Sequence, residues 1–187
     1  MLNLQTDWRI LALRNQYRQY AQDYDLAEPV WIGDTCYQFQ QEPLFEGKIK
    51  VYLPSQFKDL SEESVRERYP SIHRPQVIRS NEDNTVHFSF SLVGGCELPL
   101  TAEAVWQEID RLFPSNVLYD TGSCKAGGLD IVWLEYKSFS TEAEVYNILF
   151  PIMSKGAEAV IGAFHCPFTS YDIWKPCVLQ VIRTIQD

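Results

Sequence analysis

The chain has 187 residues, 45% of them hydrophobic and 13% aromatic, which is enough apolar material for one domain with a well-buried core. Its 16 basic and 25 acidic side chains give a formal net charge of −9, and this charge repels nucleic-acid phosphates and anionic membrane surfaces. We therefore expect neither nucleic acid nor a membrane as a partner.

The start of the chain and its cysteines predict a soluble protein of the cytoplasm. The first residues mix Asn3, Asp7 and Arg9 with apolar side chains instead of forming a basic segment followed by an apolar one, and no run approaches 18 apolar residues. An odd number of widely spaced cysteines without a C-x-x-C pair favours free thiols over a disulfide framework or a zinc site. The five cysteines are Cys36, Cys96, Cys124, Cys166 and Cys177.

The first predicted element is an amphipathic helix over about residues 6–24, because one apolar stripe recurs at spacings of three and four. The stripe consists of Ile10, Leu13, Tyr17, Tyr20 and Tyr24. Such a stripe either packs on its own domain, which is the more common case, or forms a dimer. We expect a monomer or a weak homodimer through this helix. Residues 30–32 and 36–39 are candidates for short strands beyond it.

The stretch from Phe45 to Leu92 predicts a strand, a helix and a hairpin, and everything after it is interpreted as the completion of one sheet. Ile49, Val51 and Leu53 alternate with polar residues in the period of a half-buried strand. A helix then begins with Ser61 as its N-cap and ends at Tyr69, because Pro70 follows.

The predicted hairpin turns at Asn81-Glu82-Asp83-Asn84 and continues into an alternating strand over residues 86–92. Its apolar face carries Phe88 and Phe90, and its polar face carries His87. The turn also has the oxygen ligands that a hard cation prefers, but two acids in a four-residue turn are more simply explained by turn chemistry.

The second half of the chain predicts a helix from Thr101 to Phe113, four strands and a closing amphipathic helix from Thr169 to Ile185, kinked or begun at Pro176. The strands cover residues 117–123, 129–137, 145–153 and 158–166. Short connections make the last three strands antiparallel. Large apolar residues on both faces of Ile131–Tyr136 indicate that the sheet is covered on both sides.

We therefore predict an α+β fold in which a three-layer α/β/α sandwich surrounds a largely antiparallel sheet of about five to seven strands. The chain is predicted to be a single domain over residues 1–187. Residues 1–44 form an N-terminal helix and a short extension, and residues 45–187 form the core.

Several motifs occur in one order along residues 45–187, before a terminal amphipathic helix. They are Val51-Tyr52-Leu53-Pro54, Arg68-Tyr69-Pro70, Arg74-Pro75-Gln76, the hairpin from Asn81 to Phe90, Phe164-His165-Cys166-Pro167 and Trp174-Lys175-Pro176. This order resembles the PsbP-like fold, in its bacterial DcrB-like branch. The resemblance implies a three-layer sandwich around an antiparallel sheet.

The roles known in that family are non-enzymatic: an extrinsic subunit of the photosynthetic oxygen-evolving complex, a nuclear-transport factor that binds a small GTPase, and a periplasmic protein linked to phage sensitivity. Because these roles disagree, the resemblance implies the fold and not one function. It supplies no catalytic residues. We also expect the chain to lack the export signal of the lumenal and periplasmic members, so the resemblance implies no compartment.

Catalytic and cofactor motifs are absent from the sequence, which contains no G-x-G-x-x-G, P-loop, H-E-x-x-H, G-x-S-x-G or EF-hand pattern. His73, His87 and His165 are isolated, and most histidines in such positions are structural or solvated. His165 and Cys166 are neighbours in a strand and so point to opposite faces, which argues against a thiolate–imidazole pair. We expect no cofactor, no metal and no enzymatic activity.

The sequence feature most suggestive of function is a group of basic residues within an otherwise acidic chain: Arg66, Arg68, His73, Arg74 and Arg79. Arginine binds carboxylates and phosphates with two parallel hydrogen bonds, so this group is a candidate binding site. The alternative is that neighbouring glutamates of the same helix pair with these arginines. Two functions are left open: a protein-binding or adaptor module with an unidentified protein partner, and a small-molecule or anion binder that uses this basic group.

Overall fold

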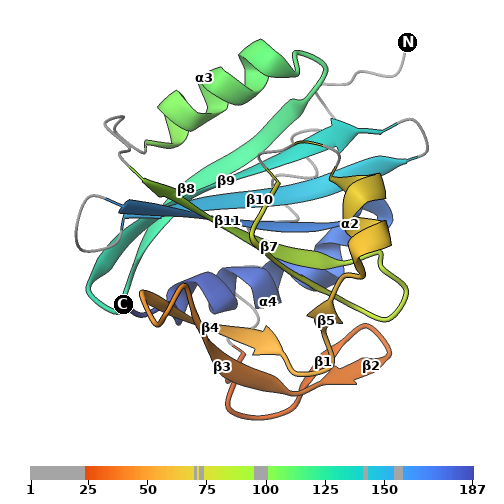
Figure 1. Ribbon diagram of the computed structural model, residues 1–187, viewed down its shortest axis with the longest axis vertical. Coiled ribbons are helices and arrows are strands. Elements are labelled where there is room, and N and C mark those ends of the chain that lie inside the picture. Colours follow the sequence, from red (N-terminus) through yellow and green to blue (C-terminus); the bar gives the residue numbers. More distant parts are fainter. Residues whose placement is uncertain (1–23, 70, 72–73, 95–100, 141–142, 154–157) are drawn as a thin grey trace.

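The computed structural model describes residues 24–69, 71, 74–94, 101–140, 143–153 and 158–187 (Figure 1). The helix predicted over residues 6–24 lies outside this part of the chain, apart from its last residue. Cys96, His73 and the side chain of Arg68 lie outside it as well.

The centre of the fold is a seven-stranded sheet in which every neighbouring pair of strands is antiparallel. Its order is β5 (Lys58–Asp59), β6 (Val77–Ser80), β7 (His87–Gly94), β11 (Glu158–Pro167), β10 (Glu144–Met153), β9 (Leu129–Phe139) and β8 (Val117–Ala126). Strands β8 to β11 form the predicted antiparallel succession. The hairpin β6–β7 joins it through β11, so a strand from late in the sequence lies in the middle of the sheet.

Helices lie on both faces of this sheet, and Figure 1 shows α4 (Tyr171–Arg183) on one side and α3 (Ala102–Leu112) on the other. Leu134 of β9 is fully buried and its neighbour Trp133 is partly buried, although they point to opposite faces. The predicted three-layer α+β architecture is therefore confirmed. Among the described residues, no helix combines the length and apolarity needed to cross a bilayer.

Two of the helix starts are as predicted. Ser61 caps α2 (Glu62–Arg68) and Thr101 caps α3, each accepting a hydrogen bond from the backbone three residues on. The predicted start of the last helix is wrong, because a 3₁₀ turn at Phe168–Ser170 precedes α4 and Pro176 lies inside the helix.

Four short strands form two smaller sheets below α4 in Figure 1: β1 (Val30–Ile32) with β2 (Thr35–Tyr37), and β3 (Phe39–Leu44) with β4 (Ile49–Pro54). The predicted strand at Ile49 exists, but the expectation of a single sheet is wrong. The apolar face of β4 is fully buried and covers the side of α4 that faces away from the central sheet. Lys50 of β4 also forms a β-bridge with Gln186, just beyond α4.

The space between the sheet and α4 holds most of the apolar core. Phe88, Phe164 and Trp174 follow one another with ring centroids 5.0 and 5.6 Å apart. Packing is close enough that Phe150 occupies the place where a Cβ at Gly162 would stand, with 2.1 Å between them. The face is interrupted by one ion pair, between Lys175 of α4 and Glu135 of β9, in which both side chains are buried.

The opposite face of the sheet carries a row of polar side chains. His87, His165 and Asn147 lie side by side on β7, β11 and β10, and His87 is only 5% exposed. His87 thus lies on the polar face of its strand, as predicted, and it is buried there. Asn147 Nδ2 donates to Ser138 Oγ at 2.9 Å, and His165 Nδ1 lies 2.7 Å from Asn147 Oδ1.

Candidate functional site

A cleft of about 740 Å³ opens between β2, β5 and the turn that joins β6 to β7. It therefore lies where the small β1–β2 sheet approaches the short edge of the central sheet. The volume falls within the range of about 300–1,000 Å³ that is typical of ligand sites in proteins.

The floor of the cleft is aromatic. Tyr37 reaches the surface, and beneath it lie Phe57 and Trp174, whose ring centroids are 5.9 and 5.2 Å from that of Tyr37. Phe57 and Trp174 are buried, so the position of the Tyr37 ring is fixed by the core. Burial raises the pKa of Tyr37, and the nearby charge of Asp83 raises it further, while a hydrogen bond from Thr35 opposes the shift.

One wall of the cleft is the β6–β7 turn, and side-chain hydrogen bonds hold its shape. Asn81 Oδ1 accepts from the backbone N–H groups of Thr85 and Val86, both at 2.9 Å, and Ser80 Oγ donates to Asn84 Oδ1 at 3.2 Å. Asn84 adopts φ of +54°, which asparagine tolerates better than most residues. The oxygens of both asparagines thus take part in hydrogen bonds of the turn. The sequence favours this explanation of the segment over a cation-binding loop.

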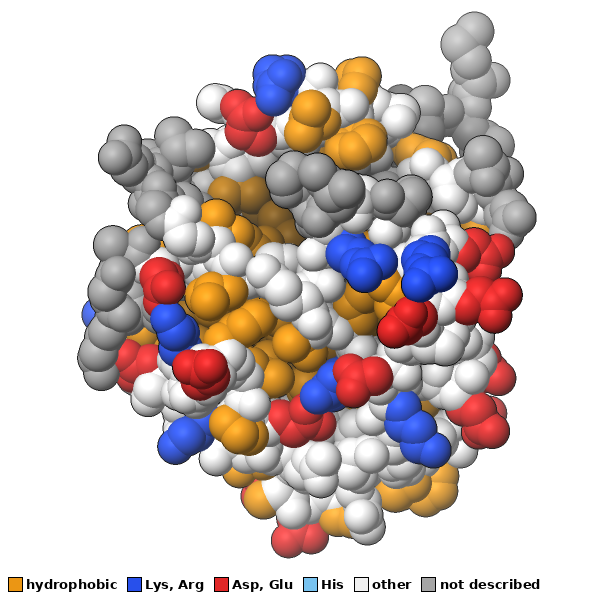
Figure 2. Space-filling view, viewed as in Figure 1, with side chains coloured by type: hydrophobic (Ala, Val, Ile, Leu, Met, Phe, Trp, Pro, Cys, Tyr) orange, Lys and Arg blue, Asp and Glu red, His pale blue; other side chains and the backbone are white. Residues whose placement is uncertain are grey.

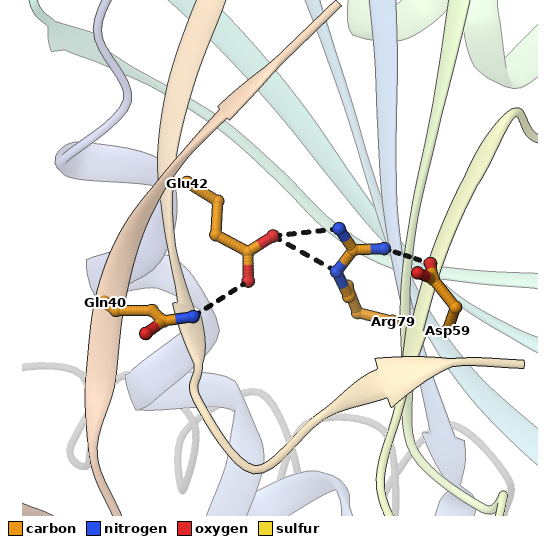
Figure 3. A network of polar contacts seen from close by, with 4 residues as sticks. All are labelled: Gln40, Glu42, Asp59 and Arg79. Atoms are coloured by element: carbon orange, nitrogen blue, oxygen red, sulfur yellow. Dashed lines mark hydrogen bonds and ion pairs between the residues drawn. The ribbon is translucent and has the colours of Figure 1, made fainter.

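The wall formed by β5, beside this turn, is held by an ion-pair network, shown in Figure 3. Arg79 of β6 uses Nε and Nη2 to bind Glu42 Oε2 of β3, both at 3.1 Å, and uses Nη1 to bind Asp59 of β5. Gln40 Nε2 supports Glu42 from the other side at 3.5 Å. The network connects the β3–β4 sheet to the edge of the central sheet.

The electrostatics of the cleft are acidic. Asp59, Glu82 and Asp83 line it together with a single cation, Lys58, while the charge of Arg79 is offset by Glu42 behind the wall. Acidic side chains also gather along the side of the molecule where α2 and the β6–β7 turn lie, to the right in Figure 2. The local surface therefore favours a cationic over an anionic ligand.

The predicted basic site is only partly assembled. Arg66 pairs with Glu62 one helical turn away, at 3.0 Å, and both Glu62 and Arg74 line a small pocket of about 180 Å³. Arg79 takes part in the network of Figure 3. The structure thus pairs Arg66 and Arg79 with carboxylates of the protein and places Arg74 on a pocket without an ion pair to any residue that it describes, while the Arg68 side chain and His73 lie outside what it describes. Binding at these residues stays a prediction.

Chemistry at the histidines is limited by burial. The carboxamide of Asn147 donates to Ser138 and to the Val145 carbonyl, so its oxygen accepts and Nδ1 of His165 carries the hydrogen. Burial, with His87 beside it, lowers the pKa of His165 to about 4. At neutral pH this imidazole is uncharged and held in place, which suits a structural role.

The cysteines are equally unsuited to nucleophilic chemistry. Cys166 faces the α4 side of the sheet, away from His165, and burial raises the pKa of its thiol and that of Cys177. All four described cysteines are free thiols, as predicted. Within the described part of the chain, no group of three or more His, Cys, Asp or Glu is arranged to hold a metal ion.

Known proteins resemble this chain only at the level of structure, because no family model and no curated protein sequence matches it. The solution structure of cyanobacterial PsbP (CyanoP) from Synechocystis sp. PCC 6803 is similar with a TM-score of 0.61 and 10% identity, covering 84% of this chain and 96% of that one. The chain has a PsbP/Mog1-like fold.

Two further structures with this PsbP/Mog1-like fold are similar to the chain. The Ran-binding protein Mog1p of Saccharomyces cerevisiae has a TM-score of 0.57 and 11% identity, covering 80% of this chain and 95% of that one. LpqN, involved in cell envelope biogenesis of Mycobacterium tuberculosis, has a TM-score of 0.51 and 14% identity, covering 88% and 99%. Identities this low establish the fold alone.

Sequence reasoning missed the cleft, whose aromatic floor and acidic wall come from separate segments of this PsbP/Mog1-like fold. Nothing in the sequence around Tyr37 or Phe57 indicates that these two side chains are in contact. The buried Glu135–Lys175 pair was also missed, although a single glutamate within the apolar run Ile131–Tyr136 was a signal that could have found it. Trp31 is 65% exposed on β1, one of the short strands that the sequence suggested.

Proposed function

We propose that this protein is a non-catalytic protein-binding module that holds a segment of its partner in the cleft between β2 and the β6–β7 turn. The observation that carries the proposal is the cleft itself, with its volume of about 740 Å³ and the Tyr37 ring at its floor. Partly exposed aromatic rings on a fixed base are common anchors of protein interfaces. Both walls are braced by hydrogen bonds and ion pairs, which lowers the ordering cost of binding.

The chemistry available in the cleft supports binding over catalysis. Its described lining contains carboxylates, amides, hydroxyls and one lysine, but no histidine or cysteine. His165 and Cys166 lie on opposite faces of the central sheet, away from this lining, and each is held in a form unsuited to acid–base or nucleophilic work.

The fold gives weaker support. One structural neighbour is named as a Ran-binding protein, so a protein partner is a reasonable expectation for a chain of this shape. The four free thiols favour the reducing setting of the cytoplasm. Assignment to the bacterial DcrB-like branch rests on the sequence motifs alone, and we include it in the proposal on that basis.

Binding of an anion by the predicted basic group is the other function considered. It has less support, because carboxylates already bind Arg66 and Arg79, and because Arg74 lines a small pocket together with Glu62, the partner of Arg66. An external anion would have to displace the carboxylates from Arg66 and Arg79.

Selection of peptides from a random displayed library tests the proposed site without assuming a ligand. Wild-type protein is the target, and each selected peptide is remeasured against Thr35→Trp, which fills the mouth of the cleft from an exposed position on β2. The matched control is Thr121→Trp, at an exposed threonine on β8 at the other edge of the sheet.

We expect peptides that bind wild type and Thr121→Trp equally and lose binding to Thr35→Trp, while thermal melts show both variants folded. If both tryptophan variants bind every selected peptide as wild type does, the cleft is not the binding site and the proposal is wrong. An empty selection contradicts it as well.

A further inference from the structure

The cleft contains carboxylates that none of the described residues neutralises. Glu82 and Asp83 stand exposed at the tip of the β6–β7 turn, and neither forms an ion pair with any residue that the structure describes. By contrast, the two other carboxylates at this edge, Glu42 and Asp59, both bind Arg79. The unpaired charge is thus concentrated at the mouth of the cleft.

The Tyr37 ring adds a second, independent preference for positive charge. An aromatic face attracts ammonium and guanidinium groups through its quadrupole, with about 0.5–2 kcal/mol of stabilisation depending on solvent exposure. The ring is fixed by Phe57 and Trp174 below it, and Asp83 is close enough for its charge to act on the Tyr37 hydroxyl. A cation over the ring would therefore also lie in the field of a carboxylate on the same cleft.

The charged hydrogen-bonding groups around this point are mostly acceptors. The carboxylates of Glu82, Asp83 and Asp59 accept only, whereas Lys58 is the single charged donor on the described lining. A ligand rich in N–H donors would satisfy these groups, while a second carboxylate would not. The net charge of −9 further steers a cationic partner toward the protein.

Building on the proposed function, we propose that the cleft selects a lysine or arginine side chain of the partner segment, with the cation placed over Tyr37 and paired with Asp83. Glu82 strengthens the same field from the tip of the turn. The rest of the segment then lies along the mouth of the cleft, toward the acidic first turn of α2, which carries Glu62 and Glu63.

Fluorescence anisotropy with labelled Gly/Ser peptides that contain three lysines, three arginines, three glutamines or three glutamates tests this selectivity. We expect measurable binding of the lysine and arginine peptides only. The reversal Asp83→Lys should raise the Kd of the lysine peptide about tenfold or more, equivalent to about 1.4 kcal/mol. Asp110→Lys, at an exposed acid on α3, changes the net charge equally and is expected to leave that Kd within about twofold.

A second pair of variants measures the contribution of the Tyr37 ring to peptide binding separately from that of Asp83. Tyr37→Phe keeps the aromatic face and should bind the lysine peptide as wild type does, whereas Tyr37→Leu should bind it about threefold or more weakly. Thermal melts of both variants control for the packing of Tyr37 on Phe57.

Five results would overturn the inference. Equal weakening by Asp83→Lys and Asp110→Lys would mean diffuse attraction by net charge, and equal binding of the glutamine peptide would mean that charge is not selected. Tighter binding of spermidine than of the lysine peptide would point to a free polyamine. Equal binding of the lysine peptide by Tyr37→Leu and Tyr37→Phe would show that the Tyr37 ring does not contribute to binding. Non-basic peptides that are still blocked by Thr35→Trp would defeat this inference while leaving the proposed function intact.

Discussion

The space between α4 and the central sheet and the cleft at the β5 edge both contain aromatic rings and charged side chains. They differ in how their carboxylates are compensated. Under α4, the carboxylate of Glu135 is wholly buried and its cation, Lys175, is supplied by the protein. At the cleft, water solvates Glu82 and Asp83, so these carboxylates need no internal partner. Burial thus decides whether a charge serves stability or is left available for recognition.

The buried pair is the sharpest test of this contrast. Lys175→Met removes the cation and leaves Glu135 buried without compensation, so we expect a loss of about 3–5 kcal/mol in the free energy of unfolding. Urea denaturation followed by circular dichroism measures it. The double variant Glu135→Leu/Lys175→Met should recover most of that loss, because an apolar pair needs no solvation. A loss below about 1 kcal/mol in the single variant would show that Glu135 is solvated or protonated.

The polar row on the other face of the sheet predicts a pH dependence. The pKa of His165 in the folded protein, about 4, lies below its unfolded value of 6.5, so the unfolded chain binds the proton more readily between these values. Stability from this residue is fully present above pH 6.5 and is lost as the pH falls toward 4, by at most about 3 kcal/mol.

Unfolding titrations of wild type and His165→Gln at pH 7.5, 6, 5 and 4.5 measure this contribution. The glutamine keeps a donor for Asn147 but has no charge to gain. The difference in stability between the two proteins should shrink steadily as the pH falls. A difference that stays constant across this range would contradict a lowered pKa at His165.

The ion-pair network behind the cleft has a degree of burial between those of the two regions, because the side chains of Arg79 and Glu42 are 21% and 16% exposed. Arg79→Met should therefore cost about 1–3 kcal/mol, less than the buried lysine. A double-mutant cycle with Glu42→Gln isolates the coupling between the two side chains. Zero coupling would mean that Arg79 contributes by packing alone and that the wall of the cleft is held by other contacts.

The smallest effects are expected at the exposed arginines. Arg66→Ala and Arg74→Ala should each change stability by no more than about 0.5 kcal/mol, because exposed pairs and surface substitutions contribute little. Thermal melts with and without millimolar phosphate extend the test. An upward shift of several degrees with phosphate in wild type, absent in Arg74→Ala, would favour the anion site over the cation-selecting cleft.

Local signals in the sequence predicted the local structure well. The caps at Ser61 and Thr101 and the antiparallel succession of the last strands depend on groups only a few residues apart, so the sequence states them directly. The start of α4 was mispredicted because Thr169 and Asp172 have the spacing of a cap, yet residues 168–170 form a 3₁₀ turn instead.

Features that depend on distant segments were not predictable in the same way. Glu135 and Lys175 are 40 residues apart, and nothing near either one indicates the other. β4 has the alternation of a central strand, but its burial comes from packing on α4 in a separate sheet. The cleft joins Tyr37 with Asp83, and its acidic character emerges only when the turn and β2 are placed side by side.

The position of β11 has a consequence for how the chain folds while it is being synthesised. β7 pairs on one side with β6 and on the other with β11, and its face toward α4, which carries Phe88 and Phe90, is covered only in part, by Phe57, until residues 158–167 and α4 exist. At elongation rates of about 5–20 residues per second, the roughly 70 residues between these strands take several seconds to translate. The nascent chain therefore carries an exposed aromatic hairpin over that interval, and we expect chaperones that bind apolar segments to raise the yield of folded protein.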